Sequence, residues 1–108
     1  MTVETVDHDG ARALEVHLDQ ATLVHDLTLL RRELPRVLLD GHGTVTVDLG
    51  SVDRLSSATV AALLRLKRLC LVHGVEMRVR NPRGRGRSVM RRCGLLETEG
   101  VSVLGARS

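Results

Sequence analysis

The sequence predicts a single α/β domain, because segments with the alternation of strands take turns with segments of helical period. Thr44–Leu49 is a run of β-branched and aliphatic residues typical of a strand covered by helices. Ala21–Leu39 and Ala58–His73 place leucines at three- and four-residue spacing, as a helix with one buried face does. A chain of 108 residues is long enough for one hydrophobic core, so we expect residues 1–108 to form one domain.

The N-terminal segment predicts a β-hairpin. Val3–Val6 and Ala11–Leu18 are strand-like runs on either side of Asp9-Gly10, a pair that favours a tight turn. In the first helix, Pro35 predicts a kink or a restart, because proline has no N–H to donate. Gly74 is expected to end the second helix in a left-handed conformation.

The C-terminal third predicts the last elements of the sheet. We expect a strand at Val75–Val79, an exposed loop at Arg83–Arg87, a short helix at Ser88–Cys93 and a last short strand at Val101–Leu104. Strand–helix–strand connections cross over with one hand. The order of strands and helices along the chain therefore predicts a mixed sheet of four to five strands with helices mainly on one face.

The composition excludes several classes of function. Phe, Trp and Tyr are absent, so the core must be aliphatic, and binding of single-stranded nucleic acid by stacking on these side chains is excluded. Binding to nucleic acid through the arginine loop ranks last, because a single short loop offers few phosphate contacts. Arginines are concentrated near the C-terminal end, and in the Gly-rich loop the side chains of Arg83, Arg85 and Arg87 are either solvated or in contact with an acidic partner or a polyphosphate.

No reactive site or membrane segment emerges from the sequence. No apolar run is long enough to span a membrane and no signal peptide is present, so we expect a cytoplasmic protein without membrane insertion. Cys70 and Cys93 are expected to be buried apolar residues. The histidines follow no ligand spacing and no nucleophile–base pair is evident, so we expect no enzyme, metal or cofactor.

Thr44–Leu96 resembles the STAS family, the domain shared by sulfate transporters and anti-sigma factor antagonists. The resemblance lies in a strand ending in Asp-Leu, a serine-containing helix start, and a helix that ends before a glycine and a strand. These features fall on Val45–Leu49, Val52–Val60 and His73–Met77, followed by Asn81-Pro82 and Cys93–Leu95 as the closing loop and helix end.

The resemblance implies binding to an anti-sigma factor or serine kinase, with a switch at Ser57. In the antagonist branch a serine in an Asp-Ser-Ser-Gly motif at this helix start is phosphorylated, and that position falls on Ser57. Here Ser56 replaces the motif's aspartate, and alanine and threonine occupy its last two positions. The implied docking residues are Asp53, Ser56, Ser57, Ala58 and Thr59.

Several interpretations of this helix start remain open at this point. Ser56 or Ser57 is the natural N-cap of the second helix, so the serines could serve capping alone, docking without phosphorylation, or a phosphorylation switch. Ser57-Ala58 is also similar to the Ser-Ala of STAS subunits that bind the ATPase of a lipid transporter of the ABC type. The sequence leaves the partner open, and a homodimer as well.

Overall fold

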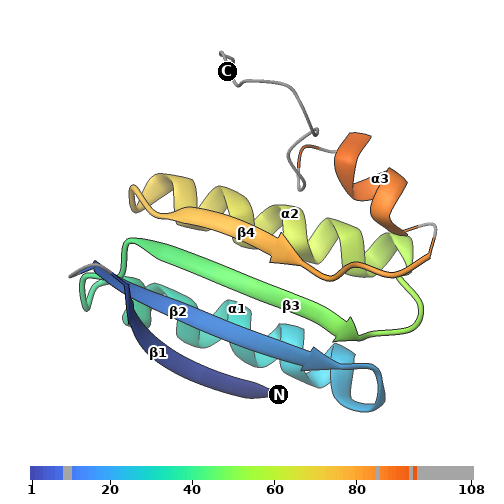
Figure 1. The fold of residues 1–108 in the computed structure, drawn as a ribbon, viewed down its shortest axis with the longest axis horizontal. Helices are drawn as coiled ribbons and strands as arrows, with labels where there is room; N and C mark the ends of the chain where they lie inside the picture. Colours follow the sequence, from blue (N-terminus) through green and yellow to red (C-terminus); the bar gives the residue numbers. More distant parts are fainter. Residues whose placement is uncertain (9–10, 85, 93, 95–108) are drawn as a thin grey trace.

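The computed structural model describes residues 1–8, 11–84, 86–92 and 94. Strands and helices alternate along these residues (Figure 1). The strands are β1 (Thr2–His8), β2 (Ala11–Asp19), β3 (Thr44–Ser51) and β4 (Glu76–Arg80). The helices are a short 3-10 turn η1 (Gln20–Thr22), α1 (Leu23–Leu38), α2 (Ser57–Val72) and α3 (Gly86–Arg92).

The four strands form one mixed sheet in the order β1-β2-β3-β4. β1 and β2 are antiparallel, with Thr2 opposite His17 and His8 opposite Ala11, so the predicted hairpin is confirmed. β3 is parallel to both β2 and β4. The fold class is therefore the predicted one; the segment Val101–Leu104, for which a further strand was expected, lies outside the described residues.

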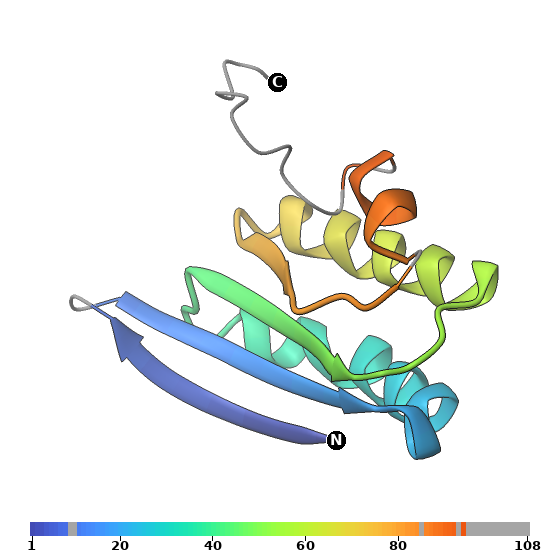
Figure 2. The same ribbon diagram turned by 45° about the vertical axis from the view of Figure 1, so that its right-hand side comes forward.

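Both long helices lie side by side on one face of the sheet (Figures 1 and 2). The β2–α1–β3 and β3–α2–β4 connections advance across the sheet in the same direction, and connections of one hand then place both helices on the same face. The strand sequence fits this arrangement. Along β3, Val45 and Val47 are buried, whereas Thr46 and Asp48 alternate with them and are only half-buried.

An aliphatic core fills the space between the sheet and the helices. Each fully buried leucine contributes roughly 1.5–3 kcal/mol of transfer free energy to this core. Met90 connects α3 to the same core, and Lys67 of α2 donates a hydrogen bond to the carbonyl of Gly94, just after α3. The largest fully buried side chains are Leu18, Leu34, Leu49, Leu63 and Met90.

Two sequence-based expectations about helices need correction. α1 runs through Pro35 as one helix, so the expected restart is wrong; the buried side chains of Leu34 and Leu38 hold the turns on both sides of Pro35 against the core. α3 begins at Gly86, two residues before the expected start. Glycine is costly only in a helix interior, and Gly86 is the first residue.

Other local expectations are confirmed within the described residues. Gly74 has a φ of 70°, the left-handed conformation expected after α2. Cys70 is fully buried, and burial raises the pKa of its thiol to about 11. Cys93 lies outside the described residues. No helix in the described part of the chain is long and apolar enough to cross a membrane.

Candidate functional site

The serine-containing helix start lies where the parallel strands of the sheet end. β2, β3 and β4 run in the same direction, so their carboxyl ends share one edge, and the loop from β3 to α2 leaves from that edge. Val52 anchors this loop in the core with a fully buried side chain. The loop residues Asp53, Arg54 and Ser56 that follow it are exposed.

Ser56 is the N-cap of α2. Its backbone is extended, with φ −81° and ψ 164°, and its hydroxyl accepts a hydrogen bond from the N–H of Thr59 at 3.1 Å. The hydroxyl groups of Ser56 and Thr59 also lie 3.0 Å apart. Thr59 is 6% exposed, so it faces the interior and contributes to this site by holding Ser56 rather than by presenting its own side chain.

Ser57 is the first residue of α2, and its side chain is exposed. No hydrogen bond to the Ser57 hydroxyl is found within the part of the chain that the structure describes. Ala58 beside it is exposed as well. Since Ser56 already caps the helix, the hydroxyl of Ser57 is available for another contact or for modification.

Two contacts fasten the loop that precedes Ser57 to other parts of the same edge. Arg83, in the segment after β4, donates a hydrogen bond to Asp53 Oδ1 at 2.8 Å, and both side chains are exposed. The N–H of Arg54 donates to Gln20 Oε1 of η1 at 2.8 Å. Sequence reasoning did not assign a role to Gln20, and its position 34 residues from Arg54 in the chain gave no local signal for this contact.

The basic segment is divided between a loop and a helix. Arg83 lies in the loop and pairs with Asp53, whereas Arg87 is an exposed residue in the first turn of α3. Arg87 was therefore wrongly placed in the expected exposed loop, because α3 begins at Gly86. Arg85 lies outside the described residues.

A charged cluster that sequence reasoning missed occupies the open face of the sheet at the same edge. Burial acts to raise the pKa of Asp48, but hydrogen bonds outweigh it and hold the pKa below its ordinary value. A Cβ on residue 50 would come within 3.0 Å of Asp48 Oδ1, so the close turn there favours glycine. The donors to Asp48 are the Gly50 N–H at 2.7 Å, Arg80 Nε at 3.1 Å and Asn81 Nδ2 at 3.2 Å.

Arg80 also connects Asp48 to the neighbouring strand β2. Its Nη2 lies 3.4 Å from Glu15 Oε1, and the ring of His17 lies 3.7 Å from Asp48 and 3.9 Å from Glu15. The signal for this cluster was present in the sequence: Asp48 and Arg80 sit at the ends of successive strands, which meet when those strands are parallel.

Ser57 presents a hydroxyl at a helix N-terminus, where the free N–H groups and the helix dipole favour negative charge. Within the described ranges, no three His, Cys, Asp or Glu side chains come together as metal ligands.

The chain is similar to known proteins both in sequence and in fold. A family model described as "Mlab, STAS domain" matches residues 5–104. Among solved structures, one titled "Structure of the Bacillus Cell Fate Determinant SpoIIAA in the Phosphorylated Form" superposes with a TM-score of 0.59. It is 15% identical to this sequence, and the match covers 87% of this chain and 85% of that one. No curated protein matches the sequence at a significant level.

Proposed function

Because this chain belongs to the STAS domain family, we propose that it acts without catalysis, as an anti-sigma factor antagonist-like module that docks on a protein partner. The docking surface is formed by the exposed side chains of Asp53, Ser56, Ser57 and Ala58, hereafter the α2-start surface. The partner is an anti-sigma factor or serine kinase. The observation that carries this proposal is the different roles of two adjacent serines: Ser56 caps α2, whereas the exposed hydroxyl of Ser57 has no hydrogen-bond partner among the described residues.

Phosphorylation of Ser57 is the proposed switch. A phosphate on the first residue of α2 would lie where the helix dipole favours negative charge, so it would leave this domain folded. Its effect would then fall on the partner, whose surface would have to accommodate about two negative charges in place of a hydroxyl. A loss of roughly 3 kcal/mol of binding free energy would lower the affinity by more than a hundredfold. The fold of the phosphorylated SpoIIAA structure supports the proposal as a similar scaffold only.

A second candidate function is that of a STAS subunit docking on the ATPase of an ABC-type lipid transport system. The description "Mlab, STAS domain" of the matching family model favours it. The sequence Ser57-Ala58 at the start of α2 suits this transport function as well as it suits the antagonist function. The two candidates differ in the partner and in the response to a negative charge at Ser57.

Affinity enrichment from the cells that make this protein separates the two candidates. The baits are the wild-type domain, Ser57→Asp, and Val24→Asp as a matched control. Val24 is 79% exposed in the first turn of α1, so the control adds the same charge to a comparable helix position. Retained proteins are identified by mass spectrometry, and the affinity of each purified candidate is then measured by calorimetry.

The antagonist function predicts that an anti-sigma factor or kinase is retained by the wild type and by Val24→Asp and lost with Ser57→Asp. Equal retention of that protein by Ser57→Asp would contradict the switch. If a transporter ATPase is retained by all three baits and binds in calorimetry, the antagonist proposal fails and the transport function replaces it.

A further inference from the structure

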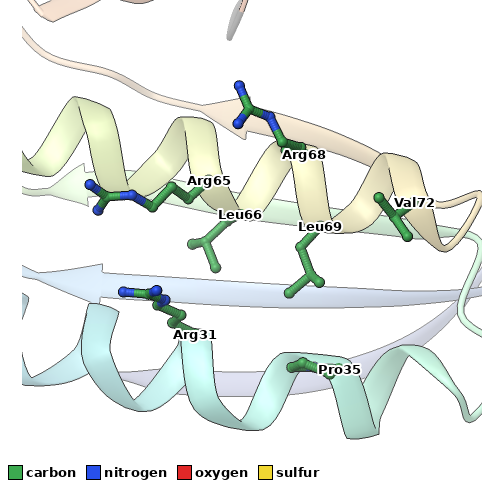
Figure 3. Close-up of a pocket in the computed structure, with 7 residues that line it drawn as sticks. All are labelled: Arg31, Pro35, Arg65, Leu66, Arg68, Leu69 and Val72. Atoms are coloured by element: carbon green, nitrogen blue, oxygen red, sulfur yellow. The ribbon is translucent and has the colours of Figure 1, made fainter.

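The outer face of the helix layer carries a groove between α1 and α2 (Figure 3). Its main hollow has a volume of about 410 Å³, and a smaller hollow of about 120 Å³ continues it towards the N-terminal parts of both helices. Arg31, Arg65 and Leu66 line both hollows, so the two adjoin along the helix pair and together make up the groove. Neither hollow includes a residue of the α2-start surface.

The floor of the groove is apolar. Leu66 is buried in the domain core, and Leu69 and Pro35 are half-buried. Val72 at the far end is 76% exposed, which is a high value for a large aliphatic side chain. A partly exposed apolar floor of this kind on a helix pair is a site where another apolar surface can be buried.

Three arginines accompany this apolar floor. Figure 3 shows Arg31 of α1 and Arg65 of α2 with their guanidinium groups at the same end of the main hollow, reached from opposite helices, while Arg68 points away from the floor. None of the three forms an ion pair with another residue that the structure describes. Two cations on facing walls repel each other unless an anion lies between them, and guanidinium binds carboxylate in bidentate geometry.

We propose that this groove binds an amphipathic helix from a protein partner, with its apolar face on the floor and an acidic residue between Arg31 and Arg65. The groove is lined by residues of both helices, which suits a helix laid on the outer face of α1 and α2. Along α2 the lining runs from Ala62 to Val72, about 15 Å at about 1.5 Å per residue, or about three turns of the bound helix. The formal net charge of the domain, +3, has the sign that attracts such a helix.

The groove and the α2-start surface share no residue. A negative result for one proposal therefore leaves the other standing. The probe for the groove is a displayed library of peptides about 15 residues long, each built on a helical scaffold with its surface positions randomised. Selection is carried out on the wild-type domain, with counter-selection on the double variant Arg31→Glu/Arg65→Glu. Both arginines are exposed, so the double variant is expected to fold, and circular dichroism checks this.

The enriched peptides are expected to carry leucine or similar residues at helical spacing and Glu or Asp at one position beside them. In fluorescence anisotropy, Arg65→Glu should weaken the best peptide about tenfold or more, the effect of losing a charge-assisted hydrogen bond. Arg32→Glu is the matched control, because Arg32 neighbours Arg31 in α1 but does not line the groove. Replacing the acidic residue of the peptide by lysine should restore binding to the double variant and abolish it for the wild type.

Three results would overturn the proposal. The first is enrichment of no peptide on the wild type over the double variant. The second is an equal loss of affinity with Arg32→Glu and Arg65→Glu, which would reduce the effect to net charge. The third is that no peptide is enriched while the fatty acid dodecanoate, tested as a monomer, binds stoichiometrically and loses its binding with Arg65→Glu. That result would make the groove a site for a small amphiphile.

Discussion

The two serines at the start of α2 should respond differently to substitution by alanine. Ser56→Ala removes the hydroxyl that accepts the Thr59 N–H at 3.1 Å, and loss of such a cap costs about 1 kcal/mol. It also removes the contact with the buried hydroxyl of Thr59 at 3.0 Å, which moves the expected loss to about 1.5 kcal/mol. For a domain of this size the melting temperature should fall by roughly 6–10 °C.

Ser57→Ala should leave stability nearly unchanged. Its side chain is exposed and its hydroxyl makes no hydrogen bond within the described residues, so the change in free energy of unfolding should stay within about 0.5 kcal/mol. Ser57→Asp should raise stability by about 0.3–1 kcal/mol, because it places a negative charge at the N-terminus of α2. A change that stabilises the domain and weakens its complex would identify Ser57 as an interface residue.

Urea denaturation followed by circular dichroism measures all three variants against the wild type. The reasoning is refuted if Ser57→Ala costs as much as Ser56→Ala, or if Ser56→Ala is neutral. The first result would mean that Ser57 shares in capping the helix, and the second that Ser56 contributes little to the cap. In either case the proposed function would lose the observation on which it rests, the different roles of Ser56 and Ser57.

Three further predictions concern other parts of the domain. The pKa of Asp48 is lowered on folding, so its ionised form stabilises the domain at pH values above the ordinary carboxyl pKa. That contribution is lost as pH falls through the folded-state pKa. Between about pH 5 and about pH 3, urea melts should therefore show a smaller loss of stability for Asp48→Asn than for the wild type. Burial raises the pKa of Cys70 to about 11, so iodoacetamide at neutral pH should label it only after unfolding, as peptide mass spectrometry can check; labelling in the native domain would contradict its burial. Leu63→Ala should cost about 2–5 kcal/mol in thermal or urea unfolding, whereas Leu71→Ala, in the same helix but 65% exposed, should stay within about 0.5 kcal/mol; similar losses would contradict the assigned face of α2.

Elements with a strong period were predictable from the sequence. The alternation in Thr44–Leu49 and the leucine spacing after Ala58 depend on one buried face each, and the structure buries those faces. Pro35 was misjudged because local propensity does not include packing, which keeps Leu34 and Leu38 on the core. The choice between Ser56 and Ser57 as N-cap also needed the structure, since two adjacent serines are equally good caps by residue type.

Contacts between distant segments were harder to predict. Asp53 and Arg83 are 30 residues apart and exposed, so neither periodicity nor hydropathy connects them. The groove between α1 and α2 was hard to predict for the same reason. Arg31 and Arg65 each look like solvated residues on their own helix, and only the packing of the two helices brings them to one site.

The sheet order, which repeats the chain order, has a consequence for how the domain is made. Each strand pairs with the strand before it, so every closure spans one turn or one helix, and short closures favour fast folding. We expect the β1–β2 hairpin and the β2–α1–β3 unit to form while later residues are still being synthesised. The contact of Asp53 with Arg83 can form only after residue 83 has been synthesised, so the proposed α2-start surface is completed late.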